Sequence, residues 1–250
     1  MASTTLRFRP YTCAFCGRVV HPRAVSFGGV SYEVPGLCEC DGARAQREAD
    51  ELAERRRHAE ELAEQRRRIW RKAGIKPRFM GAAPDATHLP HVDSGHGLYL
   101  VGDTNAGKTH AACALLKAYI DAHTSEQFGG LHCNRVARII SVPDLLSEWK
   151  ATYNHGDEDE AQVTARYGNA DLLVLDDMGK GAPTAWALER LFQIVNHRYD
   201  YLRPTVVTTQ YEPPDLGRRL AENGDRETAR AIVRRLTCDD TRRVMVQRRR

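Results

Sequence analysis

An α/β fold is predicted from the sequence: a doubly wound parallel sheet, preceded by a small cysteine-stapled module and a long helix. Two observations predict the sheet. A glycine-rich loop stands between an apolar strand and a helical pattern, and short apolar runs then alternate with helical patterns toward the C-terminus. The third observation is that four cysteines and a long proline-free, charge-rich segment precede the loop. We expect three parts, at residues 1–41, 42–74 and 75–250.

Composition sets the class of protein. Of the 250 residues, 42% are hydrophobic and 28% are charged, a balance that is typical of a folded globular chain rather than a disordered one. No apolar stretch reaches the roughly 18–20 residues that span a bilayer. The N-terminal residues also lack the apolar core of a secretory signal. We therefore expect a cytoplasmic protein with no membrane segment.

The four N-terminal cysteines have the spacing of a metal site. Cys13 and Cys16 form a C-x-x-C-G knuckle, and Cys38 and Cys40 form a C-x-C pair. Four thiolates bind Zn²⁺ tetrahedrally, and a metal stabilises a module that is too small for a large core. The pattern predicts a structural zinc site.

Two alternatives stay open for this module. His21 could replace one cysteine of the C-x-C pair as a ligand. A redox dithiol would instead normally place the C-x-x-C beside a βαβ unit, which this region lacks. Strand-like runs at residues 18–20 and 30–34 predict a hairpin between the cysteine pairs, which favours a zinc-ribbon-like module.

Residues 42–74 form the predicted connector helix. The segment is rich in Ala, Glu, Arg and Leu, which are strong helix formers. It ends before Pro77, because the residue preceding a proline avoids helical backbone. Its apolar seam is narrow and mostly alanine, which is too weak for a self-paired coiled coil. The helix is therefore either a solvated connector or a docking surface for a partner protein.

The strongest motif is a phosphate-binding loop of the form GxxxxGK[ST], which follows an apolar strand at residues 97–101 and precedes a helical pattern at 110–122. Lys108 is expected to reach the β- and γ-phosphates of ATP, and Thr109 to ligate Mg²⁺. Asn105 tolerates left-handed backbone better than most residues. The loop residues expected to contact ATP are Gly102, Asp103, Thr104, Asn105, Ala106, Gly107, Lys108 and Thr109.

A second apolar run, residues 171–175, ends in two acids. Such a run is typical of a buried parallel strand whose carboxyl end meets the ligand crevice. Asp176 is placed to hold Mg²⁺ through water, and Asp177 to orient or deprotonate the attacking water. The alternative is that both acids cap the next helix. ATP-hydrolysing enzymes with this loop more often have Glu at the position of Asp177. The Asp side chain is one methylene shorter, so slow ATP hydrolysis is expected.

Further strands fit the same sheet. A strand at residues 138–142 precedes a helix at 144–153, and a strand at 204–209 follows a helix at 185–199. Residues 244–246 could form a last strand, and the acidic stretch 155–160 is expected to be a loop. Gln210 ends the strand at 204–209, so its amide could sense the γ-phosphate. This order gives the doubly wound sheet.

At this point the chain resembles the DnaC/IstB-type AAA+ ATPases, so the α/β part is expected to be a P-loop AAA+ core. The likeness covers about residues 73–236. It is carried by residues 73–79, the loop 102–109 with His110, the acidic strand 172–179, the helix 186–199 and the strand 204–210.

Two functional branches share that core: replicative helicase loaders and transposase helper ATPases. A zinc-ribbon-like segment followed by a helix is similar to the DnaI-type loaders. In those proteins the N-terminal domain grips the replicative helicase and the ATPase domain binds single-stranded DNA. The resemblance therefore implies an ATP-dependent replicative helicase loader. The alternative is an IstB-like transposase helper ATPase that acts on duplex DNA.

The resemblance also implies roles for residues outside the loop. An arginine finger that reaches the nucleotide of a neighbouring subunit would be Arg230 or Arg235, which implies an ATP-dependent homo-oligomer. The alternative is a solvated arginine-rich helix face. The implied DNA contacts are Lys180, Thr184 and Trp186, and Trp186 offers either a stacking face for bases or a core side chain. Residues 217–250 hold eleven arginines and five acids, a balance that suits phosphate contacts.

Overall fold

The computed structural model describes residues 8–152, 159–238 and 241–247. It divides into two compact units, Met1–Ala63 and Glu64–Arg250. The boundary falls inside one long helix, α1 (Asp41–Lys72), which confirms the long helical segment predicted before the glycine-rich loop.

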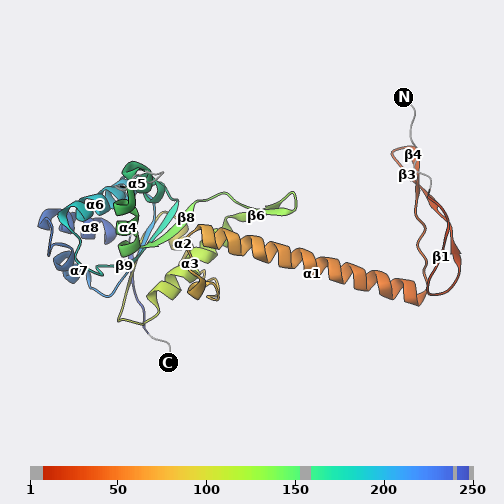
Figure 1. Cartoon of the computed structure of the whole chain (residues 1–250), viewed down its shortest axis with the longest axis horizontal. Helices are drawn as coiled ribbons and strands as arrows, with labels where there is room; N and C mark the ends of the chain where they lie inside the picture. Colours follow the sequence, from red (N-terminus) through yellow and green to blue (C-terminus); the bar gives the residue numbers. More distant parts are fainter. Residues whose placement is uncertain (1–7, 153–158, 239–240, 248–250) are drawn as a thin grey trace. The chain divides into compact units, whose positions relative to one another are not determined.

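The first unit is built from two small antiparallel sheets and the start of α1 (Figure 1). Strand β1 (Tyr11–Thr12) pairs with β2 (Val19–Val20), and β3 (Arg23–Phe27) pairs with β4 (Val30–Val34). The predicted hairpin between the cysteine pairs is confirmed, but its partner strand is not the expected one. Residues 30–34 were expected to pair with residues 18–20, and that pairing is wrong, because β4 pairs with β3. The two glycines Gly28 and Gly29 have left-handed backbone, so the chain turns there and β4 pairs with the segment immediately before the turn.

The second unit contains a five-stranded sheet in the order β11-β5-β10-β9-β8, with every neighbouring pair parallel. The sheet confirms the predicted α/β class. Its strands are β5 (Leu98–Val101), β8 (Ala137–Ser141), β9 (Leu172–Met178), β10 (Thr205–Thr209) and β11 (Arg242–Met245).

Helices cover both faces of this sheet (Figure 1). One face carries α4 (Val142–Ala151), α5 (Glu160–Gly168), α6 (Ala185–Asp200), α7 (Pro213–Leu220) and α8 (Arg226–Leu236). The opposite face carries α3 (Lys108–Ala122), α2 (Leu89–Asp93), the short 3₁₀ turn η1 (Pro77–Phe79) and the last turns of α1.

Alternation along the central strands explains the two apolar cores. In β5, Leu98 and Leu100 pack on the α3 face, whereas Tyr99 and Val101 pack on the α6 face. The same alternation runs along β9, whose residues from Leu172 to Leu175 are fully buried. A strand buried on both sides must be apolar at every position, which is why these runs were visible in the sequence.

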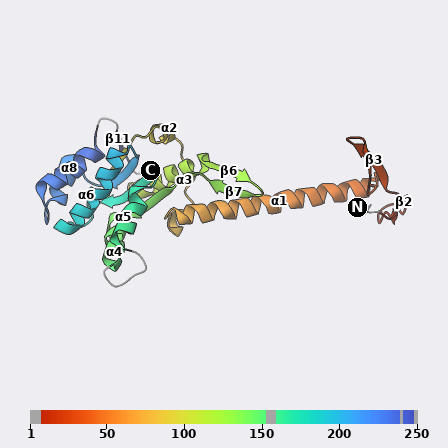
Figure 2. The ribbon, with the colours of Figure 1, turned by 90° about the horizontal axis from the view of Figure 1, so that it is seen from above.

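Several elements differ from the sequence-based expectation. Glu160 was expected in a loop but begins α5, and Asp159 caps it in a capping box with Gln162. The rest of that expected loop, residues 155–158, lies outside the described residues. The β6 (Thr124–Gln127) and β7 (Gly130–Cys133) hairpin was not predicted. It lies beside the last turns of α1 (Figure 2), where the Leu131 N–H donates to Gln65 Oε1 over 2.7 Å.

None of the described helices is long and apolar enough to cross a membrane.

Candidate functional site

The loop between β5 and α3 has the backbone that a phosphate cradle requires. Asn105 has φ +64° and Gly107 has φ +98°, so both adopt the left-handed conformation that Asn and Gly tolerate. Gly102 is needed for a different reason. A Cβ at this position would lie 2.2 Å from the Val246 carbonyl oxygen, so only glycine lets the chain after β11 pass this close.

Lys108 is the first residue of α3, and its ammonium folds back over the loop. The Nζ donates to the carbonyl oxygens of Gly102 and Asp103, each over 2.8 Å. The N-terminus of α3 therefore combines unpaired backbone N–H groups with a cation at the same point. This arrangement is able to bind the phosphates of a nucleotide.

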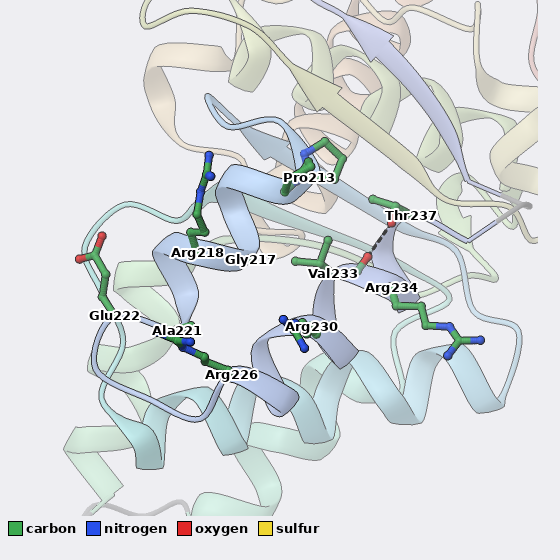
Figure 3. Close-up of a pocket in the computed structure, with 11 residues that line it drawn as sticks. Pro213, Gly217, Arg218, Ala221, Glu222, Arg226, Arg230, Val233, Arg234 and Thr237 are labelled. Atoms are coloured by element: carbon green, nitrogen blue, oxygen red, sulfur yellow. Dashed lines mark hydrogen bonds between the residues drawn. The ribbon is translucent and has the colours of Figure 1, made fainter.

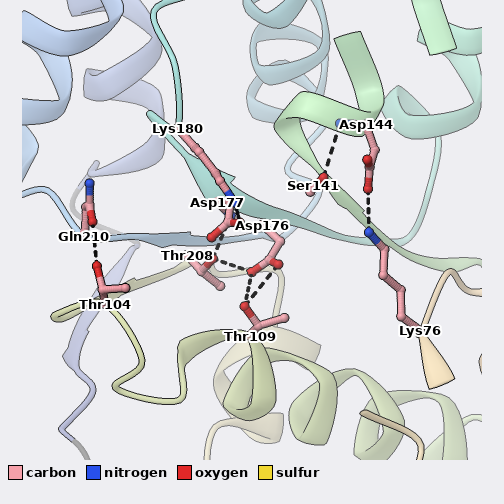
Figure 4. Close-up of polar contacts among 10 residues, drawn as sticks. All are labelled: Lys76, Thr104, Thr109, Ser141, Asp144, Asp176, Asp177, Lys180, Thr208 and Gln210. Atoms are coloured by element: carbon pink, nitrogen blue, oxygen red, sulfur yellow. Dashed lines mark hydrogen bonds and ion pairs between the residues drawn. The ribbon is translucent and has the colours of Figure 1, made fainter. Parts of the chain in front are cut away.

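Asp176 lies near the C-terminal end of β9, inside a network of hydroxyl groups (Figure 4). Its carboxylate accepts from Thr109 Oγ1 over 2.9 and 3.1 Å and from Thr208 Oγ1 over 2.5 Å. Burial raises the pKa of Asp176, although both hydroxyl groups oppose that rise. The Thr109 hydroxyl and the Asp176 carboxylate are hard oxygen ligands that lie together beside the loop, so the residues fit Mg²⁺.

Asp177 stands next in the chain but has different surroundings. Its backbone φ is +57°, its N–H donates to Thr208 Oγ1 over 3.0 Å, and its carboxylate pairs with Lys180 Nζ over 3.2 Å. The side chain lines the cleft beside the loop. The alternative that the acids cap the next helix is wrong, because α6 is capped by the Thr184 hydroxyl, which accepts from the Ala187 N–H.

Gln210, which follows β10, contacts the glycine-rich loop through its side chain. Its Oε1 accepts a hydrogen bond from Thr104 Oγ1 over 3.1 Å (Figure 4), and both residues line the cleft.

The cleft also contains residues that sequence reasoning did not assign to a site. They are Arg78, Phe79, His110, Met178, Thr209 and Tyr211. Residues 73–79 and His110 were part of the family resemblance, but nothing in their spacing relates them to the cleft. The position of Arg78 and Phe79 depends on how the segment before the core packs against α3, whereas His110 lies in the first turn of α3 and Tyr211 follows β10.

The three predicted DNA contacts have different surroundings. Lys180 lines the nucleotide cleft, and Thr184 is an exposed helix cap. Trp186 is half-buried against the core, and its ring meets that of Trp149 edge to face at a centroid distance of 6.2 Å. Of the two alternatives for Trp186, these contacts favour a core side chain.

The cysteine cluster of the first unit fits a tetrahedral metal site. The Sγ atoms of Cys13, Cys16, Cys38 and Cys40 all lie within 4.8 Å of one another. Cys13 and Cys40 are 3.7 Å apart, and Cys16 and Cys38 are 3.5 Å apart, close to the sulfur separation that a Zn–S bond of about 2.3 Å requires. His21 is not part of the cluster.

Two details of the surrounding chain prepare these thiols for a metal. The backbone N–H groups of Cys16 and Phe15 lower the pKa of Cys13 to about 6, which favours the thiolate that a metal binds. The first turns of α1 also hold the cluster, since Ala43 packs on Cys13 and Cys38, and Arg47 donates to the Cys38 carbonyl over 2.8 Å.

The two candidate arginine fingers lie in different places on α8. Arg230 is exposed and lines an open groove between α7 and α8, together with Arg226 and Arg234 (Figure 3). Arg235 instead turns toward α6. Its guanidinium lies 4.9 Å from the Phe192 ring centre and 5.6 Å from that of Tyr199, and its Nη1 donates to the Ala231 carbonyl.

Comparison with known proteins supplies the family context for this geometry. The profile of the family described as IstB-like ATP binding protein matches residues 82–247. The replicative helicase loader DnaC of Escherichia coli K12 is 27% identical over 121 residues, which cover 48% of this chain and 45% of DnaC. An insertion-sequence ATP-binding protein of Mycobacterium tuberculosis is also 27% identical, over 138 residues that cover 55% of this chain and 50% of that protein.

Solved structures share the fold of the second unit. A crystal structure of the DnaC helicase loader aligns with a TM-score of 0.52 at 23% identity and covers 69% of this chain and 100% of that chain. A crystal structure of DnaI aligns with a TM-score of 0.52 at 18% identity over 69% of this chain and 95% of that chain. The second unit therefore has the AAA+ fold of these two structures. The chain spans about half the length of the curated relatives it matches.

Proposed function

Since this chain belongs to the IstB-like ATP-binding protein family, we propose that it is an ATP-dependent replicative helicase loader that hydrolyses ATP slowly at the cleft of its second unit. The observation that carries the nucleotide assignment is the network at the loop, in which Thr109, Asp176 and Thr208 are linked beside Lys108. The helicase assignment is supported by the similarity to DnaC and DnaI.

The chemistry assigned to the cleft follows from its residues. The loop amides and Lys108 would bind the phosphates, while Thr109 and Asp176 would hold Mg²⁺, which neutralises phosphate charge when bound. Asp177 lies beside that network with its carboxylate on Lys180. We assign it the role of orienting the attacking water and accepting its proton. Gln210 would contact the γ-phosphate from the end of β10.

A second subunit would complete the site. Arg230 is exposed in an open groove, whereas Arg235 is occupied by the rings of Phe192 and Tyr199. These contacts favour Arg230 as the finger that reaches a neighbour's nucleotide. Because such a site needs residues from two subunits, ATP binding would favour a homo-oligomer.

The first unit is the proposed helicase-binding part. A structural Zn²⁺ on Cys13, Cys16, Cys38 and Cys40 would hold its small core. The β3–β4 hairpin leaves large apolar side chains in solvent: Phe27 is 81% exposed, Tyr32 52% and Val25 42%. Exposed apolar side chains gathered on one hairpin can mark a protein-binding surface, and the proposed partner is the replicative helicase.

The second candidate is a transposase helper ATPase, because insertion-sequence ATP-binding proteins are relatives of similar identity. The two candidates differ in partner and in DNA. Purified protein should be mixed with the source cell's replicative helicase and, separately, with its transposases, and complexes should be measured with ATP and with ADP. ATP-dependent binding of the helicase supports the loader. Binding of a transposase alone supports the helper.

A further inference from the structure

Lys117 is a fully buried lysine in the middle of α3. Its ammonium donates to three carbonyl oxygens, those of Phe79, Met80 and Ala82, each over 2.8 Å. An ammonium has three N–H donors, so these bonds use all of them. The same Nζ lies 4.5 Å from the ring centre of Trp70, in the last turns of α1.

A charge in this position is costly to bury. Burial lowers the pKa of Lys117, which shows that the surroundings disfavour the ammonium, although Cys113 and Asp121 oppose this effect. A methionine or leucine would fill the same space without that cost. Since the lysine gives up its hydration for three carbonyls of one short segment, its specific effect is to fix where that segment lies.

The segment that Lys117 holds forms part of the nucleotide cleft. The Phe79 carbonyl accepts from Lys117, and Phe79 is half-buried against the α3-face core. Phe79 and Arg78 both line the cleft. The phosphate end of the cleft is already built from the loop, Lys108 and Thr109. Arg78 and Phe79 bring a guanidinium and an aromatic ring to the lining of the same cleft. These groups can make contacts of a different kind: a ring on which a base can stack and donors for ribose oxygens.

We infer that Lys117 is a positioning residue for the nucleoside end of the nucleotide. It holds residues 79–82 against α3, so that Phe79 and Arg78 form the wall that contacts base and ribose. This inference rests on the proposed ATP site. Different parts of the chain would then bind the two halves of the nucleotide. The N-terminus of α3 binds the phosphates, and the segment held by Lys117 recognises the nucleoside.

The test compares two ligands that differ only in the nucleoside. Full-length protein and its Lys117→Met variant should be titrated with ATP and with inorganic tripolyphosphate, both with Mg²⁺, by calorimetry. We expect the variant to lose about tenfold or more in ATP affinity and to change less than twofold for tripolyphosphate. Phe79→Ala should give the same selective loss. Lys150→Met, an exposed lysine on α4, is the matched control and should leave both affinities unchanged.

Each outcome has a distinct meaning. Equal losses for both ligands in Lys117→Met, or no loss for either, would overturn the positioning role. If Lys117→Met does not fold, Lys117→Gln, which retains two N–H donors, should be measured in the same way, and failure of both variants to fold would also overturn the inference. If the parent protein binds neither ligand, the proposed nucleotide function fails instead.

Discussion

Asp176 and Asp177, two adjacent acids near the end of β9, lie in different surroundings. Asp176 is buried and accepts from two threonine hydroxyls, whereas Asp177 is partly exposed and pairs with Lys180. The left-handed backbone at Asp177 turns the two side chains apart. A buried acid held by hydroxyls suits a metal, and an acid that faces the cleft suits a water molecule.

The first residue-scale prediction concerns Asp177. The Asp177→Asn change keeps the shape of the side chain and removes its basicity. ATP binding should therefore survive, while the hydrolysis rate falls by about 10²-fold or more. Phosphate release and equilibrium ATP binding should both be measured. Asp200→Asn, a surface acid at the end of α6, is the matched control. An unchanged rate in Asp177→Asn would remove this residue from the mechanism.

The second residue-scale prediction separates the two arginines. Arg230→Ala should leave stability unchanged, because the side chain is exposed, and should abolish ATP-stimulated self-association and hydrolysis. Mixed with Lys108→Ala protein, it should recover some activity at the one interface where both sites are intact. Arg235→Ala should instead lower stability by about 1–2 kcal/mol, since it loses two aromatic contacts. The absence of rescue at every mixing ratio would assign Arg230 to a solvated face.

At the scale of elements, buried cations connect segments that are distant in the sequence. Arg198 of α6 is fully buried and donates to the carbonyls of Tyr167, Gly168, Ala170 and Pro204. It thereby holds the end of α5 and the turn before β10 together. Burial lowers its pKa to about 9, so the guanidinium stays charged at neutral pH.

Replacing this guanidinium should have a large effect on stability. Arg198→Met fills most of the space but removes the guanidinium donor from four buried carbonyls, of which only that of Pro204 also accepts from a backbone N–H of the described residues, that of Leu173. The free energy of unfolding should therefore fall by at least about 3 kcal/mol. Urea denaturation of the full chain measures this change. Arg234→Met, at an exposed position of α8, should stay within about 0.5 kcal/mol of the parent protein. A similarly small change in Arg198→Met would mean that water replaces the lost donor.

The first unit depends on its cysteine cluster in the same way. We expect about one equivalent of zinc per chain, and Cys13→Ser or a chelator should unfold residues 8–40 while ATP binding persists. Metal analysis and limited proteolysis, compared with the control Cys133→Ser in the second unit, test this expectation. A metal-free chain with a protease-resistant first unit would contradict the structural zinc.

At the scale of the whole molecule, the choice of DNA separates the two candidate functions. A loader should bind single-stranded DNA more tightly than duplex, and more tightly with ATP than with ADP. A transposase helper should prefer duplex DNA and deform it. Salt will weaken both complexes, because phosphate contacts are involved in either case. Fluorescence anisotropy with one strand and with its duplex, at one salt concentration, measures the preference. Tighter duplex binding with ATP would favour the helper.

The sequence by itself determined the elements whose signal is local. The loop and its left-handed Asn105, the fully apolar strand before Asp176, the long α1 and the cysteine spacing each show a pattern within a few turns of chain. Each residue's backbone preference, and the need for apolar side chains in a strand buried on both faces, can be recognised from the sequence around that residue. Such patterns can therefore be identified without a structure. The five-stranded sheet followed from the alternation of these elements.

Only the tertiary structure decided which distant residues meet. Packing between elements decides that residues 30–34 pair with 23–27, that Arg235 meets the rings of Phe192 and Tyr199, and that Trp186 meets Trp149. The clearest case is Lys117, whose helical position is indistinguishable by pattern from that of a surface lysine. Its partners lie 35–38 residues away in sequence. Contacts at that separation are set by how helices pack on a sheet, and the pattern of apolar and polar residues along one helix does not predict them.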